Sequence, residues 1–184
     1  MEANTSTSPA VLPALLRQAA QHFPKHRAIV FGGRTLDYAT FDQLSDRFAG
    51  ALAAQGIAKG DRVGLYCVNS DAFAIAYFGI LKAGAAVVPI NLLLNPKEIA
   101  FILADAGAKA LVYHEAFATS VQALQSQVSS FKFQVCIGTN RARPDHLLWS
   151  DCLSHEPASA VPLNPAEDLA AIIYTSGTTG MPKG

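Results

Sequence analysis

The chain has 184 residues, of which 51% are hydrophobic and 15% are charged. This length suits one domain or part of a larger one. The apolar content excludes a disordered chain, because burying that much apolar surface offsets the entropy lost on folding. Its 14 Lys and Arg residues balance 14 Asp and Glu residues. The chain therefore lacks the excess of positive charge that binding to nucleic acids requires.

The most apolar stretch, residues 72–90, is too interrupted to predict a transmembrane segment. Lys82 and Pro89 lie within it, whereas a membrane-spanning helix needs about 20 consecutive apolar residues. The pattern favours a buried helix, a turn and a strand. No basic residue precedes Arg17, so we expect no signal peptide, and residues 1–8 are expected to be a disordered start.

The cysteines indicate a reducing environment. Cys67, Cys136 and Cys152 form no C-x-x-C pair, and the first two fall in strand-like runs. A buried thiol in such a run behaves as a small hydrophobic group. The pattern predicts reduced, unreactive cysteines and a cytoplasmic location, where structural disulfides are rare.

The first third of the chain predicts a hairpin, a helix and a strand. Residues 28–31 and 34–36 flank a Gly-Gly turn and form the hairpin. Asp37 is the expected N-cap of a helix that ends at Gly56. A strand is predicted over residues 62–68.

Three further helices and four strands follow from the same signals. Asn69 or Ser70 is expected to cap a helix that ends near Lys82. Asn95, Pro96 and Glu98 form a capping box that starts a helix extending to Gly107. Strands are predicted over residues 85–90, 110–113, 133–137 and 169–175, a shorter helix over 116–127, and an irregular loop over 139–165.

Strands that alternate with helices of ten to fourteen residues predict an α/β fold with a mostly parallel sheet. The near-continuous apolar strands indicate that helices flank this sheet on both faces. In such sheets, ligands bind where loops leave the carboxyl ends of the strands.

The residues from Thr175 to Gly184 combine the chemical groups of a phosphate-binding loop. Hydroxyl side chains can donate hydrogen bonds, glycines allow the backbone to approach a ligand, and successive N–H groups can surround an anion. Lys183 adds a point positive charge suited to phosphate. The loop is not a Walker A motif, because Pro182 stands where G-x-x-x-x-G-K needs glycine.

The run YTSGTTGMPKG at residues 174–184 closely resembles the phosphate-binding motif of the adenylate-forming (AMP-binding) enzymes. This superfamily includes acyl-CoA synthetases such as the fatty-acid–CoA ligases, and peptide-synthetase adenylation domains. Weaker similarities precede the motif in the family's order, at residues 34–44, 59–63, 81–89 and 95–103.

The resemblance implies a two-step reaction that depends on ATP, Mg²⁺ and coenzyme A. A fatty or aryl carboxylate attacks the α-phosphate of ATP to give an acyl-adenylate and pyrophosphate, and CoA then accepts the acyl group. By the same resemblance, the residues that bind the ATP phosphates are Thr175, Ser176, Gly177, Thr178, Thr179, Gly180 and Lys183.

Members of this superfamily usually extend to about three times this length, and their remaining catalytic residues follow the loop. Residues 9–184 are therefore expected to form an incomplete N-terminal α/β portion of an AMP-binding domain, without the C-terminal lobe. We expect this portion to be inactive alone, to contain no catalytic residue and no metal site, and to self-associate through surface that the rest of the enzyme would cover.

Two alternatives stay open at this level. The chain could belong to an adenylation domain that activates an amino or aryl acid for a carrier protein, or to a non-catalytic, flavodoxin-like nucleotide-binding module. Other chemistry has little support. His22 and His26 have helical spacing, but Pro24 between them argues against a metal pair. No G-x-S-x-G or G-x-G-x-x-G motif is present.

Overall fold

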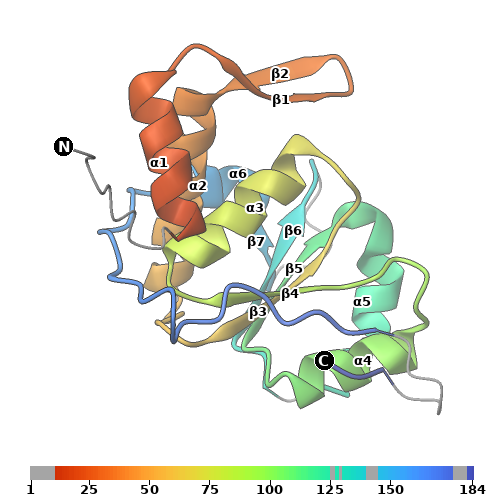
Figure 1. The fold of residues 1–184 in the computed structure, drawn as a ribbon. Helices are drawn as coiled ribbons and strands as arrows, with labels where there is room; N and C mark the ends of the chain where they lie inside the picture. The colour runs from red at the N-terminus through yellow and green to blue at the C-terminus, as the bar shows by residue number, and fades with distance from the viewer. Residues whose placement is uncertain (1–10, 125–126, 129, 140–144, 176–181) are drawn as a thin grey trace.

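The computed structural model describes residues 11–124, 127–128, 130–139, 145–175 and 182–184. Its centre is a five-stranded parallel sheet with the strand order β4-β3-β5-β6-β7 (Figure 1). The strands are β3 (Arg62–Tyr66), β4 (Ala86–Pro89), β5 (Ala110–His114), β6 (Phe133–Ile137) and β7 (Leu147–Leu148). The predicted parallel α/β sheet is confirmed.

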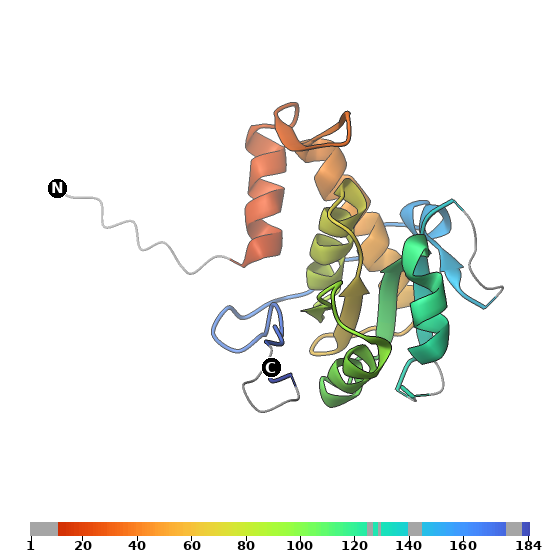
Figure 2. The ribbon, with the colours of Figure 1, turned by 90° about the vertical axis from the view of Figure 1, so that its right-hand side faces the viewer.

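Helices cover both faces of the sheet, as predicted (Figure 2). One face packs against α2 (Tyr38–Ala54), α3 (Asp71–Lys82) and α6 (Trp149–Leu153), and α1 (Leu12–His22) packs outside α2 and α3. The other face packs against α4 (Pro96–Asp105) and α5 (Ala118–Leu124), which follows a short 3-10 turn, Glu115–Phe117. In the described part of the chain, no helix is both long and apolar enough to cross a bilayer.

The hairpin consists of β1 (Arg27–Phe31) and β2 (Arg34–Asp37), which pair antiparallel apart from the main sheet. Its turn residues, Gly32 and Gly33, have φ values of 55° and 78°. Positive φ at both positions is what a two-residue hairpin turn of type I′ needs, and glycine adopts it without strain. The hairpin extends beyond the helices at one end of the molecule (Figure 1).

The three predicted helix caps are present. Asp37 accepts a hydrogen bond from the N–H of Thr40 at the start of α2. Ser70 accepts one from the N–H of Phe73 at the start of α3. Asn95 and Glu98 form the reciprocal capping box of α4. Each cap satisfies N–H groups that have no partner within the helix, so these starts are set locally.

The structure differs from the sequence predictions at several places. Helix α1 was not predicted, although Leu12, Leu15, Leu16 and Ala19 have helical spacing. The expected loop over residues 139–165 contains β7 and α6, which are too short to produce a periodic pattern. The expected helix over 116–127 is divided between the 3-10 turn and α5, and residues 125 and 126 lie outside the described residues.

The expected buried strand over residues 169–175 was also wrong. Ala171 forms one parallel bridge with Val87 at the edge of the sheet, and Leu169 and Ile173 are each 66% exposed. Burial of this segment was predicted only from the apolar character of its residues. Ile172 and Tyr174 pack against the apolar cluster on the α4 side, whereas Leu169 and Ile173 are left uncovered.

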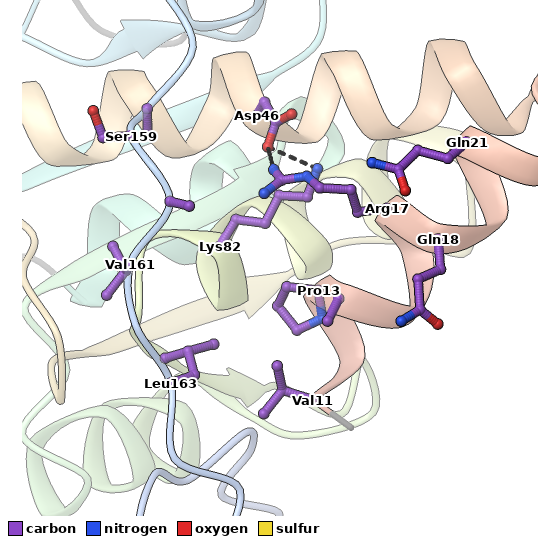
Figure 3. Close-up of a pocket in the computed structure, with 13 residues that line it drawn as sticks. Val11, Pro13, Arg17, Gln18, Gln21, Asp46, Lys82, Ser159, Val161 and Leu163 are labelled. Carbon is purple, nitrogen blue, oxygen red and sulfur yellow. Dashed lines mark hydrogen bonds and ion pairs between the residues drawn. The ribbon is translucent and has the colours of Figure 1, made fainter. Parts of the chain in front are cut away.

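A cluster of four charges joins α1, α2 and α3. Nζ of Lys82, whose side chain is 4% exposed, lies 2.6 Å from Oδ1 of Asp42 and 2.8 Å from Oδ1 of Asp46. Arg17 of α1 donates to the same Asp46 oxygen at 2.8 Å (Figure 3). A cavity of about 310 Å³ adjoins the cluster. Because buried charges must be paired, this cluster fixes how the three helices pack.

We predict that Lys82→Met lowers the free energy of unfolding by about 3 kcal/mol, because the two carboxylates lose their most buried cation. Urea denaturation followed by circular dichroism measures this change. Lys25→Met is the control, since Lys25 is 86% exposed and pairs only with Asp37 at the surface, and it should shift the midpoint little. Equal midpoints for the two variants would contradict the role assigned to Lys82.

Candidate functional site

The structure brings together the two ends of the predicted phosphate loop. The N–H of Thr175 donates to the carbonyl of Lys183 at 2.9 Å, and the N–H of Lys183 donates to the carbonyl of Thr175 at 3.0 Å. The two residues therefore form an antiparallel bridge. The other predicted phosphate-binding residues lie outside the described residues: Ser176, Gly177, Thr178, Thr179 and Gly180.

The bridge determines what the loop base can offer to a ligand. It uses the N–H and the carbonyl group of both Thr175 and Lys183, so these backbone groups are not available to a phosphate. Both residues are exposed, which leaves the hydroxyl and the ammonium group to face a ligand. A lysine ammonium is a compact charge suited to phosphate oxygens.

Tyr174 attaches the loop base to α4. Its hydroxyl donates to Oδ2 of Asp105, the last residue of the helix, at 2.5 Å. Its ring packs with Ile172 against the apolar cluster between α4 and the sheet. Burial, together with the hydrogen bond and the charge of Asp105, raises the pKa of Tyr174 to about 12. The hydroxyl therefore remains a donor at neutral pH.

Gly184 completes this attachment on the other side of the bridge. A Cβ at this position would lie 2.7 Å from ring atoms of Tyr174, closer than unbonded carbons approach. The absence of a side chain thus lets the backbone at Gly184 lie against the ring. Sequence reasoning missed the contact with Asp105, because 69 residues separate the two partners and no local pattern connects them.

Other candidate groups have structural roles. The hydroxyl of Tyr113 lies 2.7 Å from Nδ1 of the buried His146. Burial raises the pKa of Cys67 to about 11 and that of Cys152 to about 12. Little thiolate then exists at neutral pH, in agreement with the prediction of unreactive thiols. Across the described ranges, no group of three or more His, Cys, Asp or Glu residues could hold a metal ion.

Comparison with known proteins agrees with the motif. A family model described as "AMP-binding enzyme" matches residues 16–184. The long-chain-fatty-acid–CoA ligase FadD13 of Mycobacterium tuberculosis is 37% identical over 177 residues, which cover 92% of this chain and 33% of the relative. The fatty acid–[acyl-carrier-protein] ligase ScoC of Streptomyces coeruleorubidus is 35% identical, with 90% of this chain and 30% of the relative covered.

Comparison with solved structures gives the same fold. The crystal structure of the anthranilate CoA ligase AuaEII in complex with anthranoyl-AMP superposes with a TM-score of 0.87 and 27% identity. The match covers 92% of this chain and 33% of that chain. The chain therefore spans about a third of the length of the proteins that it resembles.

We predict that Tyr174→Phe weakens the base of the loop without unfolding the chain, because only the hydrogen bond to Asp105 is lost. One such bond is worth about 1 kcal/mol. Hydrogen exchange measures the effect at the amides of Thr175 and Lys183, which should exchange roughly fivefold faster.

Tyr77→Phe is the matched control, since this tyrosine lies in α3 and its ring is paired with those of Phe73 and Phe78 on the same helix. Its exchange rates at the two amides should equal those of the unchanged chain. Equal rates in Tyr174→Phe would show that the contact with Asp105 does not support the bridge.

Proposed function

Because the chain belongs to the AMP-binding enzyme family, we propose that it is the N-terminal α/β portion of an ATP-dependent acid–thiol ligase. The observation that carries this proposal is the motif at residues 174–184, with its two ends bridged and attached to α4. The reaction joins a carboxylate to AMP with release of pyrophosphate, and then transfers the acyl group to a thiol.

In this proposal the loop holds the leaving group of the first step. The hydroxyls of Thr175, Ser176, Thr178 and Thr179 and the backbone at Gly177 and Gly180 contact the β- and γ-phosphates, and Lys183 neutralises part of the charge that develops on pyrophosphate. Bound ATP supplies the activated phosphate, and Mg²⁺ shares its charge. The exposed side chains of Thr175 and Lys183 above a closed backbone bridge fit this role.

The substrate that we propose is a fatty or aryl carboxylic acid, and the acceptor is CoA. The names of the relatives support this choice, since they include a long-chain-fatty-acid–CoA ligase and an anthranilate CoA ligase. A carrier protein is the second candidate acceptor, because ScoC is a fatty acid–[acyl-carrier-protein] ligase with nearly the same identity. Assaying the full-length protein with CoA and with carrier protein distinguishes the two.

The 184 residues alone should not catalyse the reaction. The relatives are about three times as long, and orienting a carboxylate for in-line attack needs groups from more than one side of the substrate. The Mg²⁺ ligands and the acyl pocket are therefore expected in the remaining two thirds of the enzyme.

We predict that Lys183→Ala in the full-length enzyme slows acid-dependent exchange between ATP and pyrophosphate. Removing one charged donor to a leaving group typically costs about 2–4 kcal/mol in the transition state, which is roughly a 30- to 1,000-fold loss of rate. The control is Lys97→Ala, because Lys97 is exposed on α4 and outside the loop. An unchanged rate in Lys183→Ala would refute the assignment of the loop.

We also propose that the 184-residue chain self-associates. Leu12 and Leu169 line one cavity between α1 and the sheet edge while remaining substantially exposed, and Ile173 is exposed in the same edge segment. With a net charge of zero, no long-range repulsion separates two copies.

Sedimentation equilibrium should detect a dimer or larger species, with on the order of 1,000 Å² buried in total. Leu169→Asp should shift the population toward monomer, whereas Val30→Asp on the hairpin should not. A monomer at all accessible concentrations, or an equal response to both variants, would contradict the use of this surface.

A further inference from the structure

A cleft that contains no residue of the loop base lies at the carboxyl ends of β5 and β6. It has a volume of about 800 Å³ and lies between the hairpin, α2, α3, α6 and the ends of β5 and β6. Figure 1 shows the hairpin and α6 on one side of the molecule and the C-terminal segment on the other. Five residues that line the cleft carry the argument: Arg34, Asp71, His114, Ile137 and Trp149.

The topology of the sheet explains why a cleft forms here. Strands β3 and β5 are adjacent and parallel, but the chain leaves β3 for α3 on one face and leaves β5 for α5 on the other. Loops that diverge in this way leave a crevice outside the carboxyl ends of the strands. This crevice is the usual ligand position in open α/β sheets.

The lining of the cleft has the composition of a small-molecule site. Leu36, Leu44, Ile75, Ile137 and Leu153 supply apolar surface, and Trp149 adds an aromatic ring. Polar side chains line the cleft in similar number, among them Arg34, Asp71 and His114. A site of this mixed composition can hold a flat apolar body and orient it through its polar edge.

Hydrogen bonds in the structure indicate which N–H groups of Arg34 and His114 remain available to a ligand. Arg34 donates through Nη2 to Asp71, and its side chain is otherwise 71% exposed, so the remaining guanidinium N–H groups are available. Nδ1 of His114 accepts the N–H of Ala116 at 3.2 Å. In the neutral ring the proton is therefore on Nε2, which becomes a donor.

The charges of the cleft favour a neutral ligand. The guanidinium of Arg34 is balanced by the carboxylate of Asp71, so the pair carries no net charge that would select a charged ligand over a neutral one. The same pair offers both donors and acceptors to an uncharged polar edge.

We propose that this cleft binds a neutral aromatic molecule with hydrogen-bonding groups on one edge, such as a nucleobase or an aromatic amide. The ring packs against Trp149 and Ile137, and its polar edge meets Arg34, Asp71 and Nε2 of His114. This site is separate from the phosphate loop, because no residue of the loop base lines the cleft.

The test uses Trp149, which is the single tryptophan of the chain. Adenosine is the probe, because it is neutral, aromatic and polar along its edges. Its addition to the 184-residue chain should change the fluorescence of Trp149 in a saturable way. Toluene tests whether the cleft accepts any apolar molecule, and Lys183→Ala tests whether the phosphate loop contributes.

Arg34→Met should weaken adenosine binding roughly tenfold, as expected for losing a hydrogen bond from a charged donor. His114→Asn keeps an acceptor for the N–H of Ala116 but removes the Nε2 donor, and should weaken binding about fivefold. Arg27→Met is the matched control, since Arg27 is an exposed cation on the same hairpin that does not line the cleft. Thermal melting confirms that each variant folds.

Binding that is lost in Arg34→Met and His114→Asn, but retained in Arg27→Met and Lys183→Ala, supports the proposal. Three results would overturn it: no saturable change with adenosine, equal binding by toluene, or unchanged affinity in both cleft variants. A loss confined to Lys183→Ala would place adenosine at the phosphate loop and would leave the proposed function intact while excluding the second site.

Discussion

Each strand at the centre of the sheet is buried on both faces, and this constraint determines where the chain can go next. In β3, Val63 and Leu65 pack toward α3 while Tyr66 packs toward α4. In β5, Leu111 and Tyr113 are fully buried on the α4 side. A parallel sheet of this kind needs a crossover between successive strands, and helices on both faces satisfy that need together with the burial.

The same constraint positions both of the proposed ligand sites. Parallel strands end at one edge, so the loops after β3, β5 and β6 gather around the cleft. At the side of the sheet, β4 has an open edge, and the segment before the phosphate loop bridges to it through Ala171. The cleft forms because the chain leaves β3 and β5 on opposite faces of the sheet. The loop base lies beside β4 because β4 is the edge strand of the sheet.

Local signals allowed much of this fold to be predicted from the sequence. The Gly-Gly turn, the cap at Asp37 and the capping box at Asn95 and Glu98 depend on neighbours within four residues. Helix α1 was missed although its apolar residues have helical spacing, β7 and α6 are too short to give a pattern, and the remaining features depend on distant partners. Packing of α1 involves the pair between Arg17 and Asp46, and the exposure of Leu169 depends on what lies beside a sheet edge.

The candidate site could likewise be predicted from the sequence only in part. The residue types from Thr175 to Gly184 indicate phosphate chemistry from the sequence alone, because hydroxyls, glycines and a lysine are the groups that phosphate needs. Attachment of the loop to α4 could not be predicted, since Asp105 has no local relation to Tyr174.

The elements that support the two proposed sites do not overlap, and this separation has a physical consequence. The loop base depends on β4 and α4, which are consecutive in the chain, through Val87 and Asp105. The cleft depends on the hairpin, α3 and α6, through Arg34, Asp71 and Trp149. Substitutions that are far apart and share no partner have nearly additive effects. A substitution in the cleft should therefore leave the bridge between Thr175 and Lys183 in place, so the two proposed sites can vary independently on one sheet.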